Sequence, residues 1–521
     1  MSNRFREFFW FTGLRRILTS TVVLALLAGA GIAAYAIYTP DLHCATGVDR
    51  PEKGAECIGV NGDGYDFGRP ALHDVAQAIA RENRTLKKGE YATVALLLPL
   101  TSTDRDMANK VLHETQGAFV EQYRANHGSN GLVPKIRLVL ANTGVGSALW
   151  PGAVKKLEGM TGAPDHLRAV SGVATSSDET RAAVTDLTQH HIPVIGTTIT
   201  ADDIANGPKS SHFPGLARVS PTNQDEAAAL ANFADVDPRK TLMVRDNRPG
   251  DHYTSTLKSA FDGLMKGAPY ADREYTSPAN PSQDGSTANT FEQDTEVICS
   301  TQVNTILFAG RHTQLRQFVN ELGKRGCQEK PYTILTGDEG SYLGYDTKLN
   351  RSALRPRSKG AAKVTVEYAA LAHPDAWTSG NPSTPKTGGT AADYTEFFQW
   401  VATASGKEVG PIGPIGAKSL ADGQAIIAYD GMTTAVTGIR KARASSSILP
   451  DIDDVGREWS KLQGPLRVEG ASGWICLDNY GNPYDKAVPI VELAADGTPH
   501  FKELAWPKKN PPNQECVPPR S

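Results

Sequence analysis

The chain has 521 residues, of which 40% are hydrophobic and 21% are charged, and its formal net charge is −3. This length exceeds what one hydrophobic core normally serves, so we expect two or three structural units. The composition excludes a disordered or fibrous protein, and the charge balance gives no electrostatic basis for a nucleic-acid partner.

The N-terminal residues predict a membrane anchor. Residues 1–16 carry four arginines, and residues 17–38 contain no charged side chain. Such a segment is long enough to cross about 30 Å of hydrocarbon at about 1.5 Å per residue. The arginines predict a cytoplasmic tail at 1–16, a lipid-embedded span at 17–38 and an extracytoplasmic remainder. The alternative is a cleaved signal peptide, because Ala34-Tyr35-Ala36 resembles a cleavage site. Both interpretations export the rest of the chain.

The six cysteines fit an exported chain. An even number outside the cytosol indicates disulfides, and no CxxC pair points to zinc or redox chemistry. Six cysteines allow 15 pairings. Sequence order favours the pairs Cys44–Cys57, Cys299–Cys327 and Cys476–Cys516.

Residues 39–90 are expected to form an extracytoplasmic segment that leads into the main domain. Its first half is rich in turn residues, and its second half, at 71–89, has helical spacing with a Lys-Lys-Gly stop. The acidic stretch at 59–66 lacks the spacing and the closing glutamate of a calcium loop, so a tight turn is expected there.

From Tyr91 onward, apolar runs of strand length alternate with segments of helical periodicity. This alternation predicts βαβ units, parallel sheets and an α/β fold, and its restart after residue 213 predicts a second lobe. Ligands of open α/β sheets bind at the carboxyl ends of the strands, where Ser176, Thr198, Arg311 and Glu339 fall. The expected strands include 91–100, 135–144, 166–173, 192–196, 241–246, 303–309 and 331–336.

Motifs of common enzymes are missing from the sequence. It contains no GxSxG, HExxH or P-loop, and no GxGxxG after a strand. His190-His191 has no partner at metal-ligand spacing in the sequence. We therefore expect no enzyme activity, no catalytic residue, no metal and no cofactor.

Four stretches together resemble the type I periplasmic binding proteins. These are the leucine/isoleucine/valine-binding and related solute-binding proteins of ABC transporters, and the same fold forms the ligand-binding region of many receptors. The resemblance covers about residues 91–500. The stretches are SGVATSSDETRAAVTDLTQHHIPVIGTTIT (171–200), FPGLARVSPTNQDEAAALANF (213–233), GQAIIAYDGMTTAVTGIRKA (423–442) and SGWICLDNYGNPYDKAVPIVEL (472–493).

The resemblance implies two Rossmann-like lobes joined by a three-strand hinge, in a domain that spans 91–505. The chain would cross between the lobes near Ser220, His373 and Gly464, and 506–521 would form a C-terminal tail. Lobe 1 would comprise 91–219 and 374–463, and lobe 2 would comprise 220–373 and 464–505.

In the resembled family, two Ser/Thr loops of the first lobe hold the ligand carboxylate. Ser176 and Ser177 match the first loop, and Thr198 and Thr200 match the second. Helix N-termini beside such loops add free N–H donors and a partial positive charge. The alternative is that the hydroxyls only cap helices, with Ser177 or Asp178 as the N-cap.

The second lobe of the family contributes an aromatic residue and an acidic residue. Tyr253 is the nearest counterpart of the aromatic residue, and Glu339, with Asp338 beside it, matches the acid that receives an α-ammonium group. The alternative for this acidic pair is a solvated turn. Arg311 departs from the family pattern: it suits a carboxylate or phosphate ligand, or else it pairs with Glu339 and closes the site to zwitterions.

Two functional classes follow from the resemblance. The first is the substrate-binding component of an ABC transporter for amino acids or related small polar anions, with a membrane permease as partner. The second is an anchored extracellular sensor or interaction module that works through a signalling partner. A lobe pair that has lost ligand binding is a third interpretation.

Overall fold

The computed structural model describes residues 17–27, 42–128, 131–173, 175–208, 211–279, 283–355, 361–378, 384–404, 414–416 and 418–519. It divides into two units, Met1–Cys57 and Ile58–Ser521.

The first unit holds the predicted membrane anchor. Residues 17–27 are helical, and the remainder of the predicted span, 28–38, lies outside the described residues. Within the described part of the chain, no helix has the length and apolar character needed to cross a membrane. Farther along this unit, β1 (His43–Ala45) pairs with β2 (Val48–Asp49), and Cys44 is bonded to Cys57.

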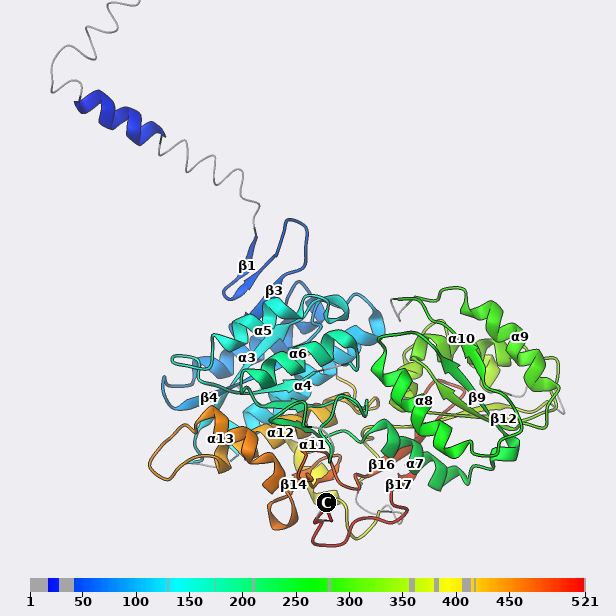
Figure 1. Ribbon diagram of the computed structural model, residues 1–521. Coiled ribbons are helices and arrows are strands. Elements are labelled where there is room, and N and C mark those ends of the chain that lie inside the picture. Colours follow the sequence, from blue (N-terminus) through cyan, green and yellow to red (C-terminus); the bar gives the residue numbers. More distant parts are fainter. Residues whose placement is uncertain are drawn as a thin grey trace, which may run out of the picture. The chain divides into compact units, whose positions relative to one another are not determined.

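The second unit contains two sheets, each flanked by helices, which define two lobes (Figure 1). In lobe 1 the strand order is β3-β5-β4-β6-β7-β8, and β3 is the antiparallel member. All eight residues of β4 are buried, as expected for a central strand of a parallel sheet. The strands are β3 (Ile58–Asn61), β4 (Tyr91–Leu98), β5 (Lys135–Asn142), β6 (Leu167–Gly172), β7 (Val194–Gly196) and β8 (Leu216–Arg218).

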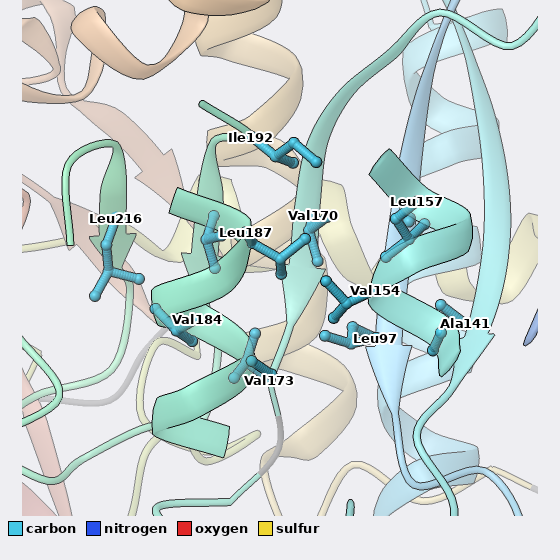
Figure 2. Packing of buried hydrophobic residues seen from close by; sticks show 14 of the residues in the cluster. Leu97, Ala141, Val154, Leu157, Val170, Val173, Val184, Leu187, Ile192 and Leu216 are labelled. Atoms are coloured by element: carbon cyan, nitrogen blue, oxygen red, sulfur yellow. The ribbon is translucent and has the colours of Figure 1, made fainter. Parts of the chain in front are cut away.

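Helices cover both faces of the lobe 1 sheet. Figure 2 shows Val154 and Leu157 of α5 and Val184 and Leu187 of α6 packed with Val170 of β6. The next residue of β6, Ser171, lies on the opposite face, toward α12. The helices of this lobe are α3 (His73–Arg84), α4 (Arg105–His127), α5 (Trp150–Glu158), α6 (Asp178–Gln189), α11 (Ala391–Ala404), α12 (Gln424–Lys441) and α13 (Ile452–Arg457).

Lobe 2 has the same three-layer design, with strand order β10-β9-β11-β12-β13-β16-β17. Alternate residues of β11 face different helices: Ile306 and Phe308 pack with α9 and α10, whereas Leu307 and Ala309 pack with α7 and α8. Its strands are β9 (Thr241–Asp246), β10 (Arg273–Tyr275), β11 (Thr305–Ala309), β12 (Tyr332–Thr336), β13 (Val364–Ala369), β16 (Val488–Leu493) and β17 (Pro499–Ala505). Its helices are α7 (Asn223–Ala234), α8 (His252–Leu264), α9 (Thr287–Cys299) and α10 (His312–Leu322).

Short elements complete the described fold. The hairpin of β14 (Val468–Gly470) and β15 (Gly473–Ile475) forms a separate small sheet. The 3₁₀ helices are η1 (Pro70–Leu72), η2 (Val145–Ser147), η3 (Pro238–Lys240), η4 (Asp338–Gly344), η5 (Arg351–Leu354), η6 (Trp459–Lys461) and η7 (Gly464–Leu466).

The chain passes between the lobes at two places close to the expected ones. It leaves the first sheet between β8 and α7, where Ser220 lies, and it leaves the second sheet after β13, near His373. The third passage differs from the expectation at Gly464, because the β14–β15 hairpin stays on lobe 1. The Asp430 carboxylate of α12 accepts hydrogen bonds from the backbone N–H groups of Ala471 and Ser472, at 2.7 and 2.9 Å. The chain therefore enters the second sheet only at β16.

The start of the folded domain also differs from the expectation. The segment 39–90 was expected only to lead into a domain that begins at Tyr91, yet β3 pairs with β5. Helix α3 is anchored to the same strand, since the Asn83 side chain donates to the carbonyl of Leu138 at 2.8 Å. Lobe 1 therefore begins at Ile58.

The expected disulfides are confirmed in all three pairs. Cys516 of the C-terminal tail bonds to Cys476, directly after β15, and both residues are buried. Since β15 belongs to lobe 1, the tail leaves lobe 2 after β17 and is fastened to lobe 1. The expected assignment of residues 464–505 to lobe 2 would have placed Cys476 in lobe 2, and for Cys476 it was wrong.

Candidate functional site

The Arg311 side chain joins loops from both lobes. Arg311 directly precedes α10 and is only 8% exposed. Its Nε and Nη2 donate to the two carboxylate oxygens of Asp251, at 2.9 and 2.8 Å, and its Nη1 donates to Oε1 of Glu339 at 2.7 Å. Nη2 also donates to the carbonyl oxygen of Ser176 in lobe 1, at 3.2 Å. One guanidinium thus binds two carboxylates of lobe 2 and the Ser176 loop of lobe 1.

Backbone contacts reinforce this junction. Ser177 and Asp251 form an isolated antiparallel bridge, and the Tyr253 N–H donates to the Ser176 carbonyl at 3.4 Å. The side chain of His252 lies 2.9 Å from Asp178 Oδ1 and 2.6 Å from Asp203 Oδ2, both in lobe 1. The loop after β6 therefore lies directly against the loop before α8.

The cationic side chains at the junction determine the pKa values of its buried carboxylates. Burial opposes ionisation of Glu339, but Arg311 and His312 outweigh it and hold the Glu339 pKa far below its ordinary value. Burial also opposes ionisation of Asp251, and Arg311 and Arg248 likewise keep its pKa low. Both carboxylates are therefore ionised at neutral pH, and Arg311 compensates both.

His312 extends the junction toward the N-terminus of α4. Its Nδ1 and its backbone N–H both contact Glu339 Oε2, at 2.6 and 3.1 Å. The ring packs against Tyr342, with centroids 5.0 Å apart, and Nε2 lies 3.7 Å from Asp106 Oδ2 of lobe 1.

Asp338, the residue before Glu339, has one unsatisfied carboxylate oxygen. Its Oδ1 is buried and has no hydrogen-bond partner among the described residues. Burial and the neighbouring Glu339 raise the pKa of Asp338 to about 7, whereas Lys110 of lobe 1 opposes the rise. Glu226, whose Oε2 accepts from the Asp338 N–H at 3.1 Å, has a pKa well above its usual value because it is buried beside Asp338.

Of the four hydroxyl residues predicted from the sequence, Ser176 and Ser177 lie at this junction, and Thr198 and Thr200 are buried in the loop after β7. Ser176 contributes its carbonyl to Arg311, and its Oγ accepts from the Ala201 N–H at 3.3 Å. Ser177 caps α6, since its Oγ accepts from the Thr180 N–H. Thr198 is buried, and the buried Oγ1 of Thr200 has no hydrogen-bond partner among the described residues.

The lobe 2 residues predicted from the sequence meet in one cluster. Tyr253 lies under Arg311, with the guanidinium carbon 4.7 Å from the ring centroid, and its hydroxyl accepts from the Glu339 N–H at 3.5 Å. The pairing of Arg311 with Glu339, one of the two alternatives, is the observed one, and with His312 it occupies both oxygens of the acid that was expected to receive an α-ammonium group.

Sequence reasoning missed Asp251, which binds Arg311 most extensively. Its local signal was a helix start: Asp251 is the N-cap of α8 and accepts from the Thr254 N–H at 3.1 Å. It also missed Asp106 and Lys110, because α4 showed only helical periodicity at these positions.

Solved structures match 80% of this chain. The leucine-binding protein LivK of Thermotoga maritima has a TM-score of 0.58 and 16% identity, over 80% of this chain and 100% of that chain. The branched-chain amino acid transporter substrate-binding protein LivJ of Streptococcus pneumoniae, in complex with isoleucine, has a TM-score of 0.56 and 14% identity, over 80% and 99%. A solute-binding protein of Rhodopseudomonas palustris HaA2, in complex with p-hydroxybenzoic acid, has a TM-score of 0.54 and 14% identity, over 80% and 96%.

The chain has the type I periplasmic-binding fold. No protein-family model matches the sequence, and no curated protein matches it. In this structure, the lobe 1 loops after β6 and β7 meet the lobe 2 loops before α8 and α10 at the Arg311 junction.

Proposed function

We propose that the protein is an extracytoplasmic solute-binding protein that closes two lobes over a small polar ligand and delivers it to an ABC permease. The type I fold supports this proposal, and so does the meeting of Ser176, Tyr253, Arg311 and Glu339 at the junction between the lobes. Such junctions between two hinged lobes are the usual place of ligand capture.

The ligand that we propose is an amino acid or a closely related small polar molecule. The observation that carries this proposal is the buried, unsatisfied Oδ1 of Asp338, since both oxygens of Glu339 are already engaged by Arg311 and His312. An ammonium group beside Asp338 would stabilise its ionised form and offset the cost of burial. The Ser176–Ser177 loop and the Thr198–Thr200 loop would then receive the anionic end of the ligand.

A thermal-shift screen of the purified protein tests this proposal. Amino acids, dicarboxylates, aromatic acids, nucleosides and sugars form the panel. One chemical class should raise the melting temperature, because a ligand at about 100 times its Kd stabilises the native state by about 2.7 kcal/mol. Asp338→Asn should abolish the shift, whereas Asp262→Asn, a change of a half-exposed carboxylate on α8, should retain it. A flat response across the panel would overturn the assignment.

We propose, in addition, that the N-terminal segment 17–38 anchors the protein in the membrane. The absence of charge over these residues supports the anchor. The expected result of alkaline extraction is that the full chain stays in the membrane fraction and that a chain starting at residue 42 does not. Release of both chains would contradict the anchor.

One observation favours the second candidate, an anchored sensor or interaction module. Arg311 is bound by Asp251, Glu339 and the Ser176 carbonyl, so groups of the protein itself already hold the two lobes together. The module would be favoured over a transporter component by two results together: no ligand of the screen raises the melting temperature, and the radius of gyration in solution is that of closed lobes and is the same with and without the ligands.

A further inference from the structure

Three side chains of metal-ligating type converge between the lobes. Asp104 and Asp106 lie at the start of α4 in lobe 1, and His312 starts α10 in lobe 2. One ligand atom from each of the three lies within 4.8 Å of those from the other two. Two carboxylates and an imidazole form a donor set that suits a divalent first-row ion.

The orientation of His312 turns its second ring nitrogen, Nε2, toward Asp106. Nδ1 lies 2.6 Å from Glu339 Oε2, and a carboxylate whose other oxygen binds Arg311 is an acceptor, so Nδ1 carries the proton. The lone pair of a neutral His312 is then on Nε2. A carboxylate that fixes the tautomer of a histidine in this way is the common outer partner of metal-bound histidines.

Asp106 supplies a second, independent observation. It is only 8% exposed, and its carboxylate faces His312 Nε2 as a long ion pair. The distance of 3.7 Å from Asp106 Oδ2 to His312 Nε2 is too long for a hydrogen bond. It is compatible with two ligands that each bind one ion at about 2.1 Å, because such ligands lie at most about 4.2 Å apart.

Asp104 completes the set from the more accessible side. Its Oδ1 caps α4 by accepting from the N–H groups of Asp106 and Met107, at 3.2 and 3.0 Å. Its other carboxylate oxygen makes no hydrogen bond among the described residues, and the residue is partly exposed, which leaves a path for an ion.

We propose that Asp104, Asp106 and His312 bind one divalent first-row transition-metal ion, best matched by Zn²⁺, and that this ion links lobe 1 to lobe 2. Three protein ligands leave at least one coordination position for water or for an oxygen of a solute. The partial positive charges of the α4 and α10 N-termini oppose the ion, but the charges of the two ligand carboxylates outweigh them. The site does not depend on the proposed solute.

A second group of similar composition lacks these features and serves as the control. Glu158, Asp186 and His190 also bring three ligand-type atoms within 4.8 Å. There, however, Nδ1 of His190 lies 2.9 Å from the carbonyl oxygen of Asp186. The same nitrogen also contacts the carboxylates of Glu158 and Asp186, at 3.3 and 2.8 Å. This arrangement is that of a protonated nitrogen with three acceptors, and the imidazole is half-exposed.

The test is a metal titration of the full, chelator-treated protein in the absence of any solute. We expect calorimetry with Zn²⁺ to give one ion per chain and Co²⁺ to give a visible absorption spectrum with nitrogen and oxygen ligation. Asp106→Asn and His312→Gln should weaken Zn²⁺ binding at least tenfold, and Glu339→Gln should weaken it about 10- to 100-fold. Asp186→Asn and His190→Gln should leave it unchanged.

Each remaining outcome overturns the proposal. If Asp186→Asn rather than Asp106→Asn abolishes Zn²⁺ binding, the metal lies on the surface of lobe 1. If the wild-type protein does not bind Zn²⁺ stoichiometrically, the proposed site does not exist. If a buried variant fails to fold by circular dichroism, Asp104→Asn, which changes a partly exposed carboxylate, gives the decision. Because the titration contains no solute, it can fail while the thermal-shift screen succeeds, and the converse also holds.

Discussion

At the scale of single residues, Arg311 determines the electrostatics of the junction. It is the cation shared by the buried carboxylates of Asp251 and Glu339. Removing one partner of a buried ion pair is far more costly than removing the whole pair, because the remaining charge stays in a poorly solvating environment.

Arg311→Leu should therefore lower the free energy of unfolding by about 3–5 kcal/mol, as measured by urea denaturation. Arg239→Leu is the matched control, since Arg239 also binds an aspartate through two nitrogens but is largely exposed. Its loss should leave the free energy of unfolding nearly unchanged, because both partners stay solvated. Equal effects of the two changes would show that Arg311 does not compensate buried charge.

Glu114 is a second buried acid, and it should make stability depend on pH. Burial raises its pKa from 4.5 to about 7, although Lys110 and Thr197 oppose the rise. The native state therefore binds more protons than the unfolded state between these two values. The stability associated with Glu114 is complete below about pH 4.5 and is lost as the pH rises through 7.

Glu114→Gln removes this titration and keeps an acceptor for the Thr197 hydroxyl, which donates to Oε2 at 3.3 Å. The difference in unfolding free energy between the variant and the wild type should increase, in favour of the variant, by up to about 3 kcal/mol as the pH is raised from 4.5 to 7.5. Urea denaturation at several pH values measures this difference. A constant difference across the range would mean that Glu114 is ionised throughout.

At the scale of elements, the contact between α4 and α12 depends on a missing side chain. A Cβ on Gly117 of α4 would lie 2.0 Å from the carbonyl oxygen of Ala425 in α12. The obstacle is backbone of a buried helix, so the two helices would have to separate.

Gly117→Ala should for this reason destabilise the protein by about 2 kcal/mol or more, despite the better helix propensity of alanine. Gly263→Ala near the end of α8 is the control, because nothing lies within 4 Å of the added carbon. It should be neutral or stabilise by up to about 1 kcal/mol. Thermal unfolding measures both, and a stabilised Gly117→Ala would show that the helices adjust freely.

Elements with a strong local signal could be predicted, and elements held by distant partners could not. The buried run at β4 and the apolar spacing of α10 indicate their structures without reference to the rest of the chain. The β14–β15 hairpin gives no such indication of its lobe. Its position follows from Asp430, about 40 residues earlier, whose carboxylate binds the hairpin backbone.

The same limit applies to the candidate site. The sequence could place Ser176, Arg311 and Glu339 at strand ends, because that follows from the βαβ order. It could not show that Asp251 satisfies Arg311, since the pairing depends on how the two sheets face each other. β3 was missed for a related reason: a four-residue strand among turn residues has little signal until β5 is beside it.

At the scale of the whole molecule, the C-terminal tail closes a covalent loop across the hinge. The chain leaves lobe 1 after Cys476, forms β16 and β17 in lobe 2, and returns to lobe 1 at Cys516. The bond spans 40 residues. It therefore limits how far lobe 2 moves from lobe 1, in addition to cross-linking the unfolded chain.

The double variant Cys476→Ser/Cys516→Ser should show both effects. For a loop of this length we expect a loss of about 2–4 kcal/mol of unfolding free energy, because the unfolded chain regains freedom. The radius of gyration measured by small-angle X-ray scattering should also increase, since the tail no longer holds the lobes together.

The double variant Cys299→Ser/Cys327→Ser separates the two effects. This disulfide joins the end of α9 to the segment after α10, so it lies entirely within lobe 2 and spans 28 residues. Its loss should lower stability by a similar amount, because the closed loops differ little in length. It should leave the radius of gyration unchanged, since no crossing between the lobes is released. If both variants expand equally, the expansion comes from general loosening and the tail does not restrain the hinge. If only the Cys476–Cys516 variant expands, the tail is the element that sets the range of lobe opening.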